Sequence, residues 1–169
     1  MEFIDIKRGY SSLFGLKYSV KNMCFLAFLV VLPNILGAFK YTTVFGLRVH
    51  FFQYAIFLTA ILYGPVGGAL SGALGSLYVA YAMSNPYILF GNVLLGYFTG
   101  YFARTGTSHM RAMYYAYALQ IPWLVLSDIF LANMTVDAVG LVVVSLTLSN
   151  IFLMYLSSKS SNLLKTWIR

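Results

Sequence analysis

The chain has 169 residues, of which 60% are hydrophobic and only 9% are charged, and its formal net charge is +7. A soluble globular domain is about 25% charged, and a chain with so few charges cannot build a water-facing surface. The composition therefore excludes a soluble domain and predicts an all-α membrane protein with a single domain, residues 1–169. The single cysteine, Cys24, excludes an intrachain disulfide and a zinc cluster.

Six apolar segments predict six transmembrane helices with short connections. Residues 1–18, which precede them, mix apolar and charged side chains and are expected to form an interfacial segment. Turns that contain Pro65 and Pro86 should make neighbouring helices antiparallel. A span needs about 20 helical residues, so the second and fourth segments are short. The expected spans are residues 19–39, 48–63, 66–83, 87–102, 112–132 and 138–158.

The basic residues predict the orientation of these spans. If the N-terminus is cytoplasmic, nine of the eleven Lys and Arg residues lie inside, and only Lys40 and Arg48 lie outside. Such a bias follows the positive-inside rule. We therefore expect both termini on the cytoplasmic side of the plasma membrane. The net charge is then explained by topology in the lipid bilayer, and no nucleic-acid partner is expected.

Residues 40–50 are the only long connection expected outside, and they could cover an outer cavity as a lid. Val44, Leu47 and Phe51 are apolar at three- and four-residue spacing. This spacing favours a short amphipathic lid.

The glycine-rich run GPVGGALSGALGS, residues 64–76, does not fit a catalytic or phosphate-binding loop. A phosphate loop needs a lysine, and none lies between Lys40 and Lys159. A nucleophilic Ser71 would need a base within reach, but His50 and His109 are expected on opposite sides of the bilayer.

Small residues at four-residue intervals instead predict close helix packing in lipid. The pattern lies in the third and fourth expected spans. It could serve helix packing within the chain or contact with a helix of a partner protein. The residues concerned are Gly64, Gly68, Gly72, Gly96 and Gly100.

Polar side chains at membrane depth are costly and are candidates for a substrate site. Most of them fall in the outer half of the expected spans. Asp128, the only carboxylate within a span, should be paired with Arg48, solvated at the interface or bound to a ligand. The aromatic residues could form an interfacial belt or stack on a flat heterocycle. The candidate substrate-binding residues are Asn34, Arg48, Gln53, Tyr78, Tyr81, Tyr87, Asn92, Trp123, Ser127 and Asp128. No catalytic pair or metal-ligating cluster accompanies them, so we expect no enzyme activity, no metal and no cofactor.

Residues 61–104 resemble the substrate-binding (S) components of energy-coupling factor (ECF) transporters. Members of this family often show a GP-x-x-G-x-x-x-G motif, an NP turn and a GN-x-x-x-G-x-x-x-G run. Here the three motifs begin at Gly64-Pro65, Asn85-Pro86 and Gly91-Asn92.

The resemblance implies a subunit that captures a vitamin or related micronutrient from outside the cell, and for this chain we expect a heterocyclic one. It further implies a membrane coupling subunit and two cytoplasmic ATPases as partners, and release by toppling in the bilayer. The A-x-x-x-A motif that meets the coupling subunit in many members is reduced to Ala27. The N-terminal histidine motif of the nickel and cobalt members is absent, which disfavours a metal substrate. Two other classes stay open: a six-span scaffold or cell-shape protein, and an integral-membrane enzyme.

Overall fold

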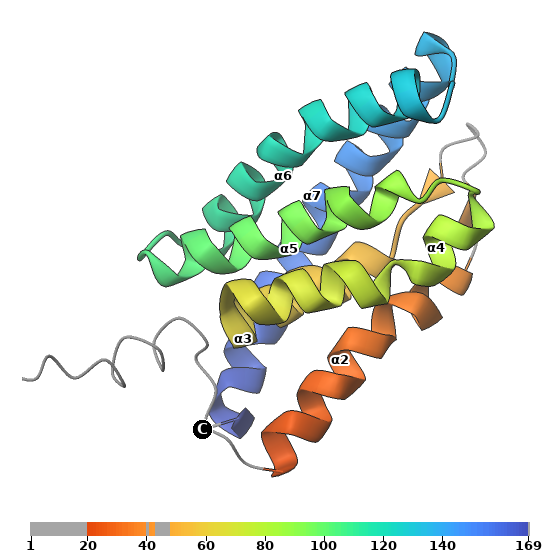
Figure 1. Cartoon of the computed structure of the whole chain (residues 1–169). Helices are drawn as coiled ribbons and strands as arrows, with labels where there is room; N and C mark the ends of the chain where they lie inside the picture. Colours follow the sequence, from red (N-terminus) through yellow and green to blue (C-terminus); the bar gives the residue numbers. More distant parts are fainter. Residues whose placement is uncertain (1–19, 40, 43–47, 169) are drawn as a thin grey trace, which may run out of the picture.

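The computed structural model describes residues 20–39, 41–42 and 48–168, which form a helical bundle (Figure 1). For this part of the chain the expected all-α class is confirmed, with one pair of two-residue strands as the exception. The interfacial segment expected at residues 1–18 lies outside the described residues. In chain order the elements are α2 (Val20–Ala38), β1 (Tyr41–Thr42), β2 (Arg48–Val49), α3 (Phe52–Gly75), α4 (Leu77–Ala82), α5 (Tyr87–Arg104), α6 (His109–Leu126), the π-helix η1 (Ser127–Leu131) and α7 (Val136–Ile168).

Helix α3 reverses direction at Gly64, so its two arms lie side by side. Gly64 has φ 76° and ψ −166°, a region that essentially only glycine adopts. In a straight helix Ala60 and residue 68 would be about 12 Å apart. A Cβ placed on Gly68 would instead lie 2.7 Å from the Cβ of Ala60. The expected turn at Gly64-Pro65 is therefore present, and Figure 1 shows the chain folding back there.

Three helical stretches in the described part of the chain are long and apolar enough to cross a membrane. They are Val20–Ala38, Phe52–Ala82 and Val136–Lys165. The second of these contains the reversal at Gly64, and α5 and α6 have 18 residues each. A membrane protein with several spans follows from these helices. The number six and the cytoplasmic side of the termini stay predictions.

Residues 66–83 were expected to be one unbroken helix, but the helix breaks at Ser76, which separates α3 from α4. Asn34 of α2 binds both sides of this break. Its Nδ2 donates to the carbonyl oxygen of Leu74 at 2.8 Å, and its Oδ1 accepts from the backbone N–H of Tyr78 at 2.8 Å. A side chain of the neighbouring helix thus satisfies backbone groups near the break, as membrane helices require.

At the described ends of the lid expected at residues 40–50 the chain is extended. There β1 and β2 pair antiparallel, with Tyr41 opposite Val49 and Thr42 opposite Arg48. Aromatic and β-branched residues favour extended pairing, and Tyr41, Thr42 and Val49 are of these kinds. Residues 43–47, between the strands, lie outside the described part.

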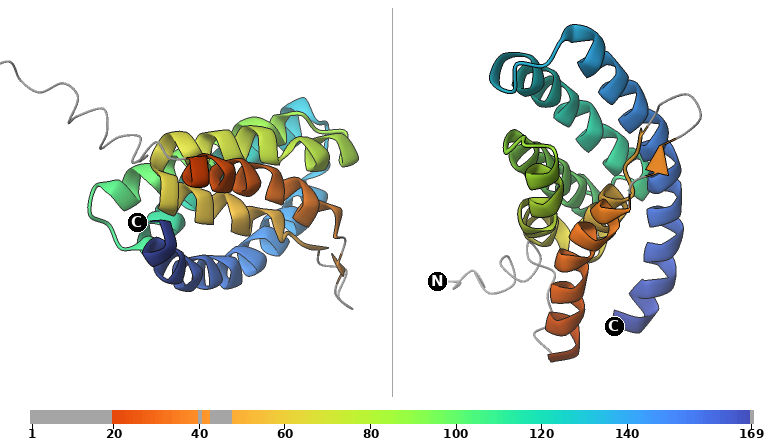
Figure 2. Two further views of the ribbon diagram at one scale, coloured as in Figure 1. Left: turned by 90° about the horizontal axis from the view of Figure 1, so that it is seen from below. Right: turned by 90° about the vertical axis from the view of Figure 1, so that its right-hand side faces the viewer.

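Helix α3 lies at the centre of the bundle, where it packs against α2, α5 and α7. Figure 2 shows α7 running along the length of the bundle. One core cluster combines Phe57 of α3, Leu95 of α5, Met113 of α6 and Leu146 of α7. Four helices far apart in sequence are therefore held together by one apolar core.

The glycines of α3 and α5 meet each other inside the bundle. A Cβ on Gly68 would overlap the backbone of Gly96, and one on Gly72 would overlap the backbone of Asn92. A Cβ on Gly100 would lie 2.6 Å from the carbonyl oxygen of Gly64. These glycines are buried and let the second arm of α3 and α5 pack backbone against backbone.

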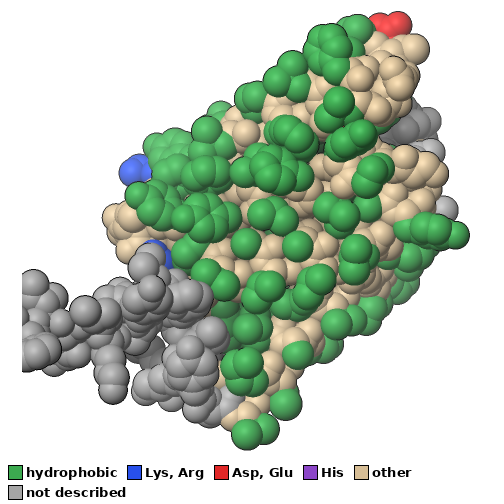
Figure 3. Space-filling model, viewed as in Figure 1, with side chains coloured by type: hydrophobic (Ala, Val, Ile, Leu, Met, Phe, Trp, Pro, Cys, Tyr) green, Lys and Arg blue, Asp and Glu red, His purple; other side chains and the backbone are tan. Residues whose placement is uncertain are grey.

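Hydrophobic side chains cover the outer surface of the bundle that Figure 3 displays. On that face, basic side chains are visible only near one end and acidic side chains only near the other. Large apolar residues such as Phe130, Phe152 and Leu148 are more than half exposed. A lipid environment accounts for such a surface, since a soluble monomer rarely exposes so much apolar area.

Candidate functional site

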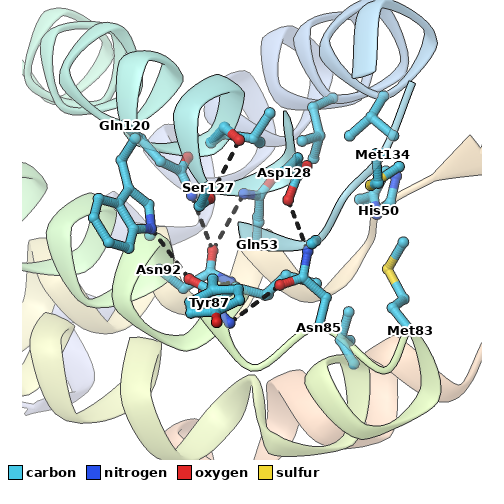
Figure 4. A pocket seen from close by; sticks show the side chains of 18 of the residues that line it. His50, Gln53, Met83, Asn85, Tyr87, Asn92, Gln120, Ser127, Asp128 and Met134 are labelled. Atoms are coloured by element: carbon cyan, nitrogen blue, oxygen red, sulfur yellow. Dashed lines mark hydrogen bonds between the residues drawn. The ribbon is translucent and has the colours of Figure 1, made fainter. Parts of the chain in front are cut away.

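A cavity of about 320 Å³ opens between helices α3 to α7, with η1 and the turns at one end of the bundle (Figure 4). Its volume falls in the range of small-molecule sites, about 300–1,000 Å³. Its walls are mostly apolar, with contributions from Phe52, Val79, Ile88, Leu124 and Leu146. Its polar lining residues are His50, Gln53, Ser84, Asn85, Tyr87, Asn92, Gln120, Ser127 and Asp128.

Three amide side chains meet at one part of the cavity, which we call the floor: Gln53 of α3, Asn92 of α5 and Gln120 of α6. The Oδ1 atom of Asn92 accepts from Nε2 of Gln53 at 3.4 Å and from Nε2 of Gln120 at 3.3 Å. All three side chains are buried, and Figure 4 shows them pointing toward one another. The floor therefore joins three helices through a single oxygen atom.

Asp128 and Asn85 form a second polar group, which we call the rim. Nδ2 of Asn85 donates to Oδ1 of Asp128 at 2.7 Å. Oδ1 of Asn85 in turn accepts from the backbone N–H of Tyr87 at 3.1 Å. Asp128 is only 6% exposed and belongs to the π-helix η1, and π-helical turns occur frequently at functional sites. The expected pairing of Asp128 with Arg48 is not described, because the Arg48 side chain lies outside the described part.

Trp123 of α6 forms an aromatic wall of the cavity. The Nε1 of Trp123 donates to the carbonyl oxygen of Tyr87 at 3.1 Å, and its ring lies 4.5 Å from that of Phe90. A Cβ on Gly91 would lie 3.1 Å from Cδ1 of Trp123. The absent side chain at Gly91 therefore lets the indole lie close to α5, where the hydrogen bond holds it.

The structure gathers six of the ten candidate substrate-binding residues around this cavity. These are Gln53, Tyr87, Asn92, Trp123, Ser127 and Asp128. The other three whose side chains are described lie elsewhere. Asn34 bridges the break at Ser76, and Tyr78 and Tyr81 are exposed, the latter by 86%.

Sequence reasoning missed four polar lining residues, His50, Ser84, Asn85 and Gln120. Gln120 carried a signal, because it precedes Ser127 by seven residues and Asp128 by eight, so the three recur after two helical turns. Asn85 was interpreted only as part of a turn with Pro86. Nothing in the local sequence indicates that it would reach a carboxylate 43 positions later.

A smaller hollow of about 180 Å³ adjoins the cavity beneath the strand pair. It is lined by Tyr41, Thr42 and Val49, and it shares His50 and Met83 with the larger cavity. The connection between α2 and α3 thus borders the site, although its described ends are strands.

Comparison with known protein families found that residues 17–162 match the family described as ECF-type riboflavin transporter, S component. This range covers most of the chain and includes every residue that lines the cavity. Comparisons with curated proteins and with solved structures found no match.

Proposed function

Because the chain belongs to the family of ECF-type riboflavin transporter S components, we propose that its cavity captures riboflavin or a closely related flavin. Members of this family are membrane-embedded subunits that capture a substrate for vitamin uptake, and they are not enzymes. The alternative of a scaffold or cell-shape protein finds no support in the family match.

The single observation that carries the flavin proposal is the division of the cavity into an amide floor, an aromatic wall and a carboxylate rim. A flavin has a flat ring with amide-like N–H and C=O groups at one edge and a chain of hydroxyls attached elsewhere. Gln120 and Asp128 are eight residues apart on one helical stretch, which corresponds to about 12 Å. This separation along the helix axis would allow a ring near the floor and hydroxyls near the rim.

Each part of this arrangement matches a chemical group of the ligand. Trp123 offers an aromatic surface against which a flat ring can pack. The Asp128 carboxylate accepts hydrogen bonds from hydroxyl groups, and a bond to an ionised acceptor is stronger than a neutral one. The amides of Gln53 and Gln120 suit the polar edge of the ring.

Energy for uptake would come from partners, as in the proposed assembly with a membrane coupling subunit and two cytoplasmic ATPases. The sequence carries no phosphate-binding loop of its own. We infer that the chain lies in the plasma membrane with the cavity facing outward. Toppling in the bilayer would then expose the bound vitamin to the cytoplasm.

Direct binding in detergent tests the proposal. The purified protein should quench riboflavin fluorescence at a 1:1 ratio, and mass spectrometry of the purified protein should identify a flavin as co-purified ligand. Asp128→Asn should weaken binding about tenfold, because a hydrogen bond to a charged group contributes about 1.5–3 kcal/mol. Asp137→Asn is the matched control, since Asp137 is exposed in the first turn of α7. A folded, ligand-free protein that binds no flavin would refute the proposal.

A further inference from the structure

The orientation of the three floor amides is fixed by hydrogen bonds, and the first of these bonds is to a backbone carbonyl. Nδ2 of Asn92 donates to the carbonyl oxygen of Ile88 at 3.1 Å. A carbonyl oxygen can only accept, so the amide of Asn92 must turn its nitrogen toward Ile88. Its Oδ1 atom therefore faces Gln53 and Gln120.

The orientation of Asn92 sets that of both glutamines. Since Oδ1 of Asn92 can only accept, each glutamine must turn its Nε2 toward it. The Oε1 atom of each glutamine then points away from Asn92. A local backbone group of α5 thus fixes the donor and acceptor pattern on side chains of α3 and α6.

Both Oε1 atoms are buried and have no hydrogen-bond partner among the described residues. Gln53 is 1% exposed and Gln120 is 3% exposed, and both line the cavity. Buried carbonyl oxygens without partners are rare in native proteins and require an explanation. A donor from a molecule in the cavity would satisfy them.

We propose that the floor selects its ligand by accepting a hydrogen bond from an N–H group at the edge of the ring, with Asn92 as the residue that orients both acceptors. This inference rests on the proposed function. The flavin ring has one such group, N3–H, which lies between two carbonyls. Each Nε2 has two hydrogens, and only one is directed to Asn92, so the other can donate to a ring carbonyl.

In this proposal the floor forms hydrogen bonds with the ring edge, and the rim forms them with the hydroxyl chain. The hydroxyls of the chain are a second source of donors for the two Oε1 atoms. We favour the ring edge, because Asp128, to which Asn85 donates, already provides a polar rim about 12 Å from Gln120 along the helix axis.

Three flavins distinguish a donor on the ring from a donor on the hydroxyl chain. Riboflavin has both donors, 3-methylriboflavin lacks the ring N–H, and lumiflavin lacks the hydroxyl chain. For the wild-type protein we expect 3-methylriboflavin to bind at least about tenfold more weakly than riboflavin, because it leaves the buried acceptors unpaired. The quantity to compare among variants is the ratio of these two dissociation constants.

Asn92→Leu tests the orienting role, because it removes the oxygen that holds both glutamines. Their amides are then free to turn, and the ratio should fall toward one even if the affinity for riboflavin also drops. A purely structural role would lower both affinities and leave the ratio unchanged. Gln120→Leu removes one acceptor directly and serves if Asn92→Leu does not fold. Thr99→Val is the matched control. Thr99 is buried on the same helix, its hydroxyl has no partner among the described residues, and it is not among the lining residues.

Equal binding of riboflavin and 3-methylriboflavin by the wild-type protein would overturn the inference and leave the proposed function intact. The inference would also be overturned if Asn92→Leu abolished discrimination against lumiflavin but not against 3-methylriboflavin, since the donors would then belong to the hydroxyl chain. If the folded protein bound no flavin, the proposed function would fail, and the inference would fail with it.

Discussion

His109, the first residue of α6, connects this helix to the end of α7. Its Nε2 lies 2.8 Å from Nζ of Lys165, and its Nδ1 lies 3.2 Å from Oγ of Ser161. An ammonium group can only donate, so Nε2 accepts and the ring proton resides on Nδ1. This arrangement requires a neutral imidazole. His109 lies outside the expected span 112–132, at the end of the bundle away from the cavity.

Acidification should weaken this contact. Burial first, and the charge of Lys165 second, lower the pKa of His109 below its usual value of 6.5. The unfolded chain then binds a proton more readily than the folded protein, so stability should fall as the pH drops below about 6.5. The melting temperature of the detergent-solubilised protein between pH 8 and pH 5 measures this effect. His109→Gln should flatten the decline, and equal slopes for both proteins would contradict the prediction.

At the scale of elements, the contact between the second arm of α3 and α5 decides the position of the floor. Gly68 and Gly96 pack backbone against backbone, and Gly72 packs against Asn92 itself. In lipid, helices gain little from hydrophobic burial and depend on such close packing. The glycine pattern thus serves packing within the chain and also sets the depth of Asn92 in the cavity.

Gly96→Ala should destabilise the protein, because its new Cβ would overlap the carbonyl group of Gly68. Overpacking of this kind typically costs about 1–3 kcal/mol. Gly140→Ala is the matched control, since nothing lies within 4 Å of a Cβ at that position of α7. We expect a clear drop in melting temperature for the first variant and little change for the second. Similar melting temperatures for the two variants would argue against backbone contact between α3 and α5.

At the scale of the whole molecule, the internal packing of the glycines limits where the proposed coupling subunit could bind. The glycine faces of α3 and α5 are buried against each other and cannot meet a second protein. Helix α2 instead exposes one side, on which Ala27, Phe28 and Val31 are accessible. Ala27 is the small residue left of the A-x-x-x-A motif that the family resemblance implies, so we propose α2 as the contact with a coupling subunit.

Ala27→Trp should therefore reduce co-purification of the coupling subunit and leave flavin binding by the isolated protein unchanged. The bulky indole would prevent close approach of another helix. Leu148→Trp is the control, because Leu148 is similarly exposed to lipid but lies on α7. Undiminished complex formation by Ala27→Trp would place the contact elsewhere on the molecule.

Local features of the sequence were enough to predict the all-α class, the membrane setting and the turn at Gly64-Pro65. Hydropathy depends on each segment's own composition, and a Gly-Pro pair acts on the backbone where it stands. The family motifs lie in the same local stretch and pointed to an S component. The strand pair was not predicted, because pairing between β1 and β2 is not a property of either segment alone.

Which polar side chains line the cavity depended on tertiary packing. Asn34 and Gln120 are both polar residues within apolar helices, yet Asn34 binds the break at Ser76 and Gln120 reaches the floor. Which of the two faces the cavity depends on how each helix is rotated about its axis. That rotation follows from contacts between distant segments, such as Gly68 with Gly96. Sequence patterns therefore revealed which side chains are costly in a membrane, whereas helix packing set which of them share one cavity.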